Sequence, residues 1–347
     1  MPDSIPPKTG PAIEPRPRHR RRRWWLWGMM LVIVVALSAL FGKTGYTINH
    51  ISVAGAIDEA KILPQADFVA KEDPDRINIL LLGLRGRGDP DGGLLTDTLL
   101  MAVINTKRNQ VALVSIPRDL FVRIPNHGAR ERINAAYARG EERHPRGGGL
   151  AYAKRVVSEI TGYKIDHALS VDFEAFREIV DAVGGVDVTL KEPFVEPTQW
   201  TGYPAFAAHN GAFVVEAGPN RLNGEQALFY VRSRFATSDF DRARRQQQVL
   251  LALKDKVLTL GILANPVTLN KILDSIASHV LTDASTEEVQ ALLGVAARLG
   301  AMPAKRKVFD TAPEGLLEET SVEGAFVLVP KGGTYDNIRS AMEQLFD

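Results

Sequence analysis

Three short, unbroken apolar runs limit the possible folds of this chain more than any other feature. They cover residues 77–82, 98–104 and 111–116, and Gly83 directly follows the first run. Runs of this length indicate strands, and the first is typical of a central strand that is buried on both faces. The polar turn at 105–109 joins the second run to the third, which favours adjacent strands.

Segments with helical periodicity follow these runs and alternate with further apolar stretches. This alternation predicts an α/β fold: a three-layer α/β/α domain with a mixed central sheet over residues 75–347. The expected helices are 150–161, 173–183, 243–260, 267–277, 286–299 and a last one from Tyr335, and the later strands are 186–190, 307–309 and 325–329.

The N-terminus carries a membrane-anchoring pattern. Residues 1–23 are rich in proline and basic side chains, which predicts a disordered cytoplasmic tail, and they end in HRRRR. The tryptophan-rich, apolar residues 24–41 follow at once and are just long enough to form a transmembrane helix. The arginines orient a single-pass anchor in the cell membrane, with residues 42–74 as a spacer and the domain outside the cytoplasm. A signal peptide is the alternative, but the span has no convincing small-residue cleavage site.

The composition excludes several chemistries. A formal net charge of +1 gives no general field for nucleic acid, so no nucleic-acid partner is expected. The absence of cysteine removes disulfides, thiolate metal sites and cysteine nucleophiles. The seven histidines have no metal-binding spacing, and no serine lies in a nucleophile elbow.

A basic run over residues 231–249 indicates an anionic partner, because only two aspartates offset its five arginines. Arginine presents a planar, permanently charged fork of donors that suits phosphate. If a helix begins at Asp241, Arg242 and Gln246 share one of its faces. The alternative is a solvated helix face of mixed charge. The five arginines are Arg232, Arg234, Arg242, Arg244 and Arg245.

Two aspartates flank the second and third predicted strands. Asp97 directly precedes the strand at 98–104, and Asp119 follows Arg118 after the strand at 111–116. Neighbouring strand ends would bring these three side chains to one edge of the sheet, where ligands of open α/β sheets bind. Carboxylates beside arginines fit a magnesium ion that bridges a phosphate. Taken singly, each aspartate also fits a turn or a cap.

Seven segments of the chain occur in a characteristic order: INILLLG, LLTDTLLMAVIN, VALVSIPRDLFVRIP, RINAAYARG, IDHALSVDFEAFREIVDAVGGVDV, LNGEQALFYVRSR and DRARRQQQV. This series, over residues 77–260, resembles the LytR-CpsA-Psr family of membrane-anchored glycopolymer transferases. The resemblance implies one N-terminal transmembrane helix and an extracytoplasmic α/β/α domain. It also implies transfer of a glycopolymer from a polyprenyl-pyrophosphate carrier in the membrane lipid to a peptidoglycan acceptor through a phosphodiester.

The resemblance implies particular site residues. Asp97 matches a magnesium-binding aspartate, and Asp119 is expected to support Arg118 or the metal. Many members have a second metal-binding aspartate where this chain has Arg85. Asp89 or Asp91 would then supply a carboxylate, or Arg85 would contact the pyrophosphate and replace part of the metal's charge. The implied catalytic residues are Asp97, Arg118, Asp119, Arg232 and Arg234, and the implied pyrophosphate ligands are Arg118, Arg232, Arg234, Arg242 and Gln246.

Two other functions would use the same charges. A polyprenyl-pyrophosphate hydrolase would use water as the acceptor and release a free phosphomonoester. A non-catalytic, regulatory protein that binds the lipid carrier would need the arginines but would tolerate loss of the metal site.

The basic block before the apolar span predicts the topology of the chain. Protease added outside intact protoplasts should digest the domain, because an excess of basic residues keeps the N-terminus in the cytoplasm. Replacing residues 20–23 by glutamates should scramble this orientation. A domain that is protected from external protease would show that the topology is wrong.

Overall fold

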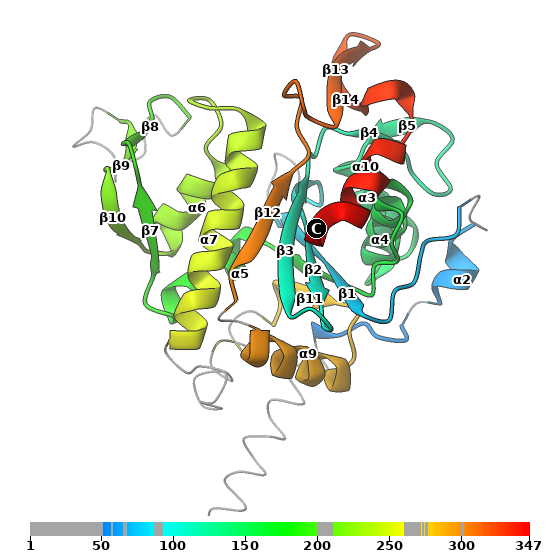
Figure 1. The fold of residues 1–347 in the computed structure, drawn as a ribbon, viewed down its shortest axis with the longest axis horizontal. Helices are drawn as coiled ribbons and strands as arrows, with labels where there is room; N and C mark the ends of the chain where they lie inside the picture. The colour runs from blue at the N-terminus through cyan, green and yellow to red at the C-terminus, as the bar shows by residue number, and fades with distance from the viewer. Residues whose placement is uncertain are drawn as a thin grey trace, which may run out of the picture. The chain divides into compact units, whose positions relative to one another are not determined.

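The structure is a computed structural model, and it describes residues 51–56, 58–64, 68–86, 93–199, 211–259, 272, 274, 277–299 and 302–347. Its centre is a six-stranded mixed sheet in the order β11-β6-β1-β2-β3-β12 (Figure 1). The pairs β1/β6 and β3/β12 are parallel, and the other pairs are antiparallel. The strands are β1 (Arg76–Leu84), β2 (Thr96–Asn105), β3 (Gln110–Ile116), β6 (His167–Val171), β11 (Val280–Thr282) and β12 (Ala304–Val308).

Helices flank this sheet, which confirms the predicted α/β fold with a mixed sheet. Helices α3 (Ala135–Arg143), α4 (Gly148–Thr161) and α10 (Asp336–Glu343) lie on one side (Figure 1). Helix α7 (Asp239–Thr259) packs against β3 and β12 on the other side, with α5 (Phe173–Ala182) and α6 (Gly224–Arg232) beside it. The remaining helices are α2 (Glu59–Ile62), α9 (Thr286–Leu299) and the short 3-10 turns η3 (Lys331–Gly333) and η4 (Gln344–Phe346).

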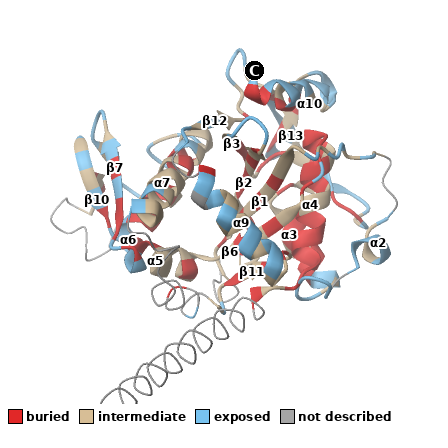
Figure 2. Cartoon of the chain, turned by 60° about the horizontal axis from the view of Figure 1, so that its bottom comes forward, coloured by how far each residue is buried: buried red, intermediate tan, exposed pale blue. Residues whose placement is uncertain are grey.

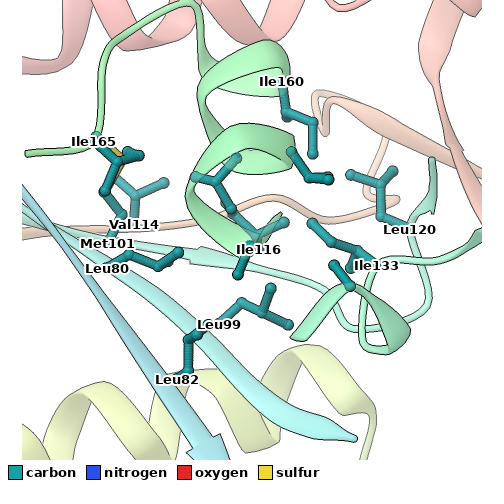
Figure 3. Close-up of a cluster of buried hydrophobic side chains, with 14 of the residues drawn as sticks. Leu80, Leu82, Leu99, Met101, Val114, Ile116, Leu120, Ile133, Ile160 and Ile165 are labelled. Atoms are coloured by element: carbon teal, nitrogen blue, oxygen red, sulfur yellow. The ribbon is translucent and has the colours of Figure 1, made fainter. Parts of the chain in front are cut away.

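The main core lies between the sheet and α4. Side chains that alternate along the strands, such as Leu80 and Leu82 of β1 and Met101 of β2, pack with Ile160 of α4 (Figure 3). The first apolar run was predicted to be buried on both faces, but β1 buries only alternate residues, Asn78, Leu80, Leu82 and Leu84, and Leu81 among them is partly exposed. Buried residues are concentrated in β2, β3, α3 and α4, whereas α9 is largely exposed (Figure 2).

Several strands lie outside the central sheet in two-stranded pairs. Two of these strands were predicted from the sequence, at 186–190 and 325–329, as parts of the one fold. Each pairs with another strand outside the six-stranded sheet. The pairs are β4 (Phe121–Arg123) with β5 (Arg130–Arg132), β7 (Val186–Leu190) with β10 (Gly218–Leu222), β8 (Phe194–Glu196) with β9 (Phe213–Val215), and β13 (Leu317–Val322) with β14 (Ala325–Pro330).

The segment at 42–74, predicted as a spacer, contributes to the domain wherever the structure describes it. Val53 N donates to Thr282 O at 2.8 Å, and Ser52 pairs with the same residue of β11. Because β11 is an edge strand, this contact covers backbone groups that would otherwise be open to another chain. Described residues of the segment that was predicted as a spacer therefore pair with the edge of the central sheet.

The predicted cytoplasmic tail and transmembrane helix, residues 1–41, lie outside the described residues. Among the helices that the structure does describe, none has the length and apolar character needed to cross a membrane.

Candidate functional site

The antiparallel pairing of β2 brings three charged residues together. Because β2 runs against both β1 and β3, its first residues lie beside the last residues of these strands. Arg85 directly follows β1, Asp97 is the second residue of β2, and Arg118 follows β3. Arg118 Nη1 donates to Asp97 Oδ1 at 2.6 Å, and Arg85 Nε donates to Asp97 Oδ2 at 3.3 Å. The sequence predicted the shared edge, but it placed Asp97 just before the strand rather than within it.

A second carboxylate extends this group into α7. Arg118 Nε donates to Asp239 Oδ2 at 3.1 Å, and Arg242 Nη2 donates to the same oxygen at 3.0 Å. The result is a chain of alternating charge, in the order Arg85, Asp97, Arg118, Asp239 and Arg242.

Helix α7 begins two residues before the predicted start at Asp241. Asp241 N donates to Ser238 Oγ at 3.1 Å, while the Asp241 carboxylate accepts a hydrogen bond from Ser238 N at 3.3 Å. This reciprocal cap stabilises the earlier start of the helix. It also places Asp239 in the first turn, next to Arg118.

A small pocket of about 70 Å³ lies against this charged chain. It is lined by five arginines and one carboxylate, Asp97, so it is strongly cationic. The guanidinium of Arg232 also lies over the ring of Phe173, 4.2 Å from its centroid. The described residues that line the pocket are Arg85, Asp97, Thr98, Arg118, Phe173, Gln199, Val231, Arg232, Arg234, Arg242 and Gln246.

The pocket brings together nearly all of the candidate catalytic and pyrophosphate-binding residues that the resemblance implied. The exception among these described candidates is Asp119, which lies behind Arg118. Its carboxylate is 3.5 Å from Arg118 Nε and 3.4 Å from Arg132 Nε, which fits a supporting position. Asp89 and Asp91, the other candidate metal ligands, lie outside the described residues.

The neighbouring charges keep the pocket residues ionised. Burial favours the neutral form of the Asp97 carboxyl, but Arg118 and two further arginines outweigh it and lower the pKa of Asp97. Burial also works against the charge of Arg118, yet Asp239 and other nearby carboxylates raise the pKa of that guanidinium on balance. Burial lowers the pKa of Arg242, although Asp239 partly offsets this. Arginine stays charged in proteins, so the pocket retains a positive excess that suits an anion.

Two arginines of the basic run point elsewhere. Arg244 is half-exposed and pairs with Asp241 at 2.8 Å and Asp310 at 3.0 Å. Arg245 is buried and holds the backbone before α7: its Nε donates to Tyr230 O at 2.9 Å, and its Nη2 donates to Ser233 O. The sequence showed five similar arginines, but only three of them line the pocket.

Two residues that the sequence did not single out fix the loop that follows Arg232, the last residue of α6, and carries Arg234. Glu196 is fully buried, and its Oε2 accepts hydrogen bonds from the backbone N–H groups of Phe235 and Ala236 at 3.0 and 3.1 Å. Gln199 Oε1 accepts from Arg234 N at 2.9 Å. Both residues lie more than thirty positions before the loop, so no local pattern could have revealed them.

The three consecutive glutamines of α7 face three different partners. Gln246 lines the pocket and donates to Val231 O at 3.3 Å. Gln247 is buried and donates to Ser115 Oγ and Lys307 O, both at 2.9 Å, which joins α7 to the central sheet. Gln248 accepts from Tyr230 Oη at 3.0 Å. Successive helical residues point about 100° apart, which is why one short run serves pocket, sheet and neighbouring helix.

A larger cavity of about 770 Å³ adjoins the pocket and shares Arg85, Phe173 and Arg232 with it. Part of its wall is apolar, and the rest carries charged side chains and a histidine, His279, whose Nδ1 is 2.7 Å from Asp172 Oδ2. The volume is in the range of pockets that hold organic ligands. The apolar lining consists of Leu84, Leu94, Tyr137, Pro145, Phe173, Leu228, Phe229, Ala277, Val280 and Leu281.

Comparison with known proteins identifies a family and individual proteins whose sequences are similar to this chain. The LytR_cpsA_psr family matches residues 46–344. The polyisoprenyl-teichoic acid–peptidoglycan teichoic acid transferase TagT of Bacillus subtilis is 29% identical over 240 residues, which are 67% of this chain and 70% of that protein. The transferase TagU of Enterococcus faecalis is 28% identical over 268 residues, 76% of this chain and 79% of that protein.

A solved structure shares the fold. The structure of TagT bound to LIIa-WTA superposes with a TM-score of 0.60 at 23% sequence identity, and the match covers 81% of this chain and 96% of that one.

Two adjacent arginines provide a test of how the loop is held. Arg245→Ala should lower the free energy of unfolding by at least about 2 kcal/mol, because it removes charged donors from buried carbonyl groups. Arg244→Ala, the matched control, removes only exposed ion pairs and should cost less than about 1 kcal/mol. Chemical denaturation of both variants measures the difference. Equal losses would show that Arg245 does not hold the loop.

Proposed function

Because the chain belongs to the LytR_cpsA_psr family, we propose that it is a transferase that moves a glycopolymer from a polyprenyl-pyrophosphate carrier onto peptidoglycan. The named activity of both relatives, transfer of teichoic acid to peptidoglycan, supports this function. The observation that carries it in this chain is the arginine-lined pocket, which shares three lining residues with the larger cavity.

The two adjoining spaces match the two chemical parts of such a carrier. A pyrophosphate needs several charged donors at close range, and the pocket is lined by five guanidinium groups. An isoprenoid tail needs apolar surface, which the cavity offers at residues such as Leu84, Leu228 and Phe229. Arg85 and Arg232 line both spaces and so lie where head and tail would meet.

Phosphoryl transfer in this pocket would depend on position and charge. A hydroxyl oxygen of the peptidoglycan sugar attacks the phosphorus that bears the polymer and forms the new P–O bond. The bond to the bridging oxygen breaks, polyprenyl phosphate leaves, and the hydroxyl proton passes to solvent. Arginines around the phosphates stabilise the charge that develops on the transferred group and the leaving group, so no protein nucleophile is required.

We further propose that residues 24–41 anchor the chain in the cell membrane, with the domain outside the cytoplasm. The basic block before this span supports the orientation. A membrane anchor would also keep the pocket close to a carrier whose tail lies in the bilayer. Both partners of the proposed reaction, the lipid-linked polymer and peptidoglycan, would then be on the same side as the domain.

The products of the reaction distinguish transfer from hydrolysis. Detergent-solubilised full-length protein should convert a polyprenyl-pyrophosphate-linked oligosaccharide and peptidoglycan fragments into a phosphodiester conjugate plus polyprenyl phosphate. Mass spectrometry of the glycan fraction detects this conjugate. A free oligosaccharide phosphomonoester, with no conjugate, would establish a hydrolase instead. Carrier binding without any product would favour the non-catalytic alternative.

The pocket arginines should be needed for binding and dispensable for folding. Replacing any one of Arg118, Arg232, Arg234 and Arg242 by alanine should weaken carrier binding by about 1.5–3 kcal/mol, roughly 10- to 100-fold, because each removes a charge-assisted contact. Arg221→Ala, which removes an exposed ion pair with Asp187, is the control and should bind as the wild type does. Titration calorimetry and thermal unfolding measure the two effects. Variants that unfold would instead indicate a structural ion-pair network.

A further inference from the structure

The Asp97 carboxylate is shared between two guanidinium groups. Arg118 Nη1 lies 2.6 Å from one of its oxygens, and Arg85 Nε lies 3.3 Å from the other. All three side chains are largely buried, with 16% to 24% of their surface exposed. Solvent therefore screens these contacts only in part, and the carboxylate already has a cationic partner on each oxygen.

These residues do not fit the magnesium ion that the family resemblance implies. Magnesium requires oxygen ligands at about 2.0–2.1 Å in near-octahedral geometry. Asp97 is the only carboxylate among the described residues that line the pocket, and an ion on its Oδ2 would have to displace Arg85 Nε. The Arg85 charge would also repel that ion. In the described part of the chain, no three His, Cys, Asp or Glu residues are grouped to hold a metal.

Arg85 itself can supply a cation at this position. A guanidinium is permanently charged and presents its N–H donors in a planar fork that suits phosphate oxygens. The contact with Asp97 fixes the side chain at the end of β1. Arg85 lines both the cationic pocket and the adjoining cavity, so it lies at the junction of the two spaces.

We propose that the Arg85 guanidinium takes the place of a divalent cation in this site, so that the chain binds an isoprenoid pyrophosphate without a metal. This inference rests on the proposed function, since it assumes that the pocket receives a pyrophosphate. Arg118 and Arg85 then act on the ligand as a pair, with Asp97 holding both in position.

Calorimetric titration of the full-length protein with farnesyl pyrophosphate, in EDTA and in millimolar magnesium, tests the proposal. The wild-type dissociation constant should agree within about twofold between the two buffers. Arg85→Ala should weaken binding roughly 10- to 100-fold in both buffers, because it removes a charged contact that magnesium does not replace. Arg85→Lys, which keeps the charge but not the fork, should bind more weakly than the wild type and remain indifferent to magnesium.

A third variant tests the sign of the charge. Arg85→Asp places a second carboxylate beside Asp97 and removes the cation, so it should bind the ligand poorly in EDTA. Magnesium should then restore binding by tenfold or more, because two carboxylates and the phosphates can share the ion. Thermal unfolding of each variant confirms that the domain is folded. If Arg85→Ala does not fold, the wild-type comparison and Arg85→Lys still decide the question.

Three results would overturn the inference. The first is wild-type binding that magnesium tightens tenfold or more, above all if Asp89→Asn and Asp91→Asn together abolish the effect. The second is Arg85→Ala that binds as the wild type does. The third is wild-type protein that fails to bind in either buffer. In the first two cases binding is still observed, so the proposed function stands and only the inference about Arg85 fails. In the third case the inference and the proposed function both fail.

Discussion

The pocket depends on holding several like charges close together. Two unit charges about 6 Å apart repel each other by about 3 kcal/mol at an effective dielectric constant of 20. Asp97 and Asp239 offset this repulsion, because each accepts hydrogen bonds from two guanidinium groups, and both share Arg118. The alternating chain of charges therefore offsets its own repulsion without a ligand, yet the pocket keeps more arginines than carboxylates and so retains a positive excess that suits an anion.

The backbone behind these charges is fixed by polar contacts rather than by apolar packing alone. Buried Arg245 and Glu196 hold the connection between α6 and α7 from opposite polar groups. Arg245 donates to the carbonyl oxygens of Tyr230 in α6 and Ser233 in the loop, and Glu196 accepts from N–H groups of the loop. Gln247 attaches α7 to β3 and β12. These contacts satisfy groups that would otherwise be buried without partners, and they hold the arginines in one geometry before any ligand binds.

The sequence predicted those parts of the site that depend on local patterns. Apolar runs identified β1, β2 and β3, and the ends of adjacent antiparallel strands then had to bring Asp97 and Arg118 together. What it could not predict depends on side-chain direction and on distant contacts. Arg245 resembles Arg242 in the sequence, but the direction of each residue on α7 separates a loop-holding side chain from a pocket side chain. Glu196 reaches the loop only through the fold, since strands β8 and β9 position it.

A fixed guanidinium and an exchangeable metal ion would stabilise a pyrophosphate in different ways. A divalent ion carries twice the charge, but its occupancy follows the ion concentration of the surroundings, and it is lost to chelators. A guanidinium stays attached and carries one charge spread over a plane, so it needs a carboxylate to position it and further cations to match the ligand. In this pocket, Asp97 is the carboxylate that positions Arg85, and the four other arginines are the further cations. Affinity in such a site would depend on arginine geometry, so the buried contacts of the α6–α7 loop would contribute to binding by positioning the arginines.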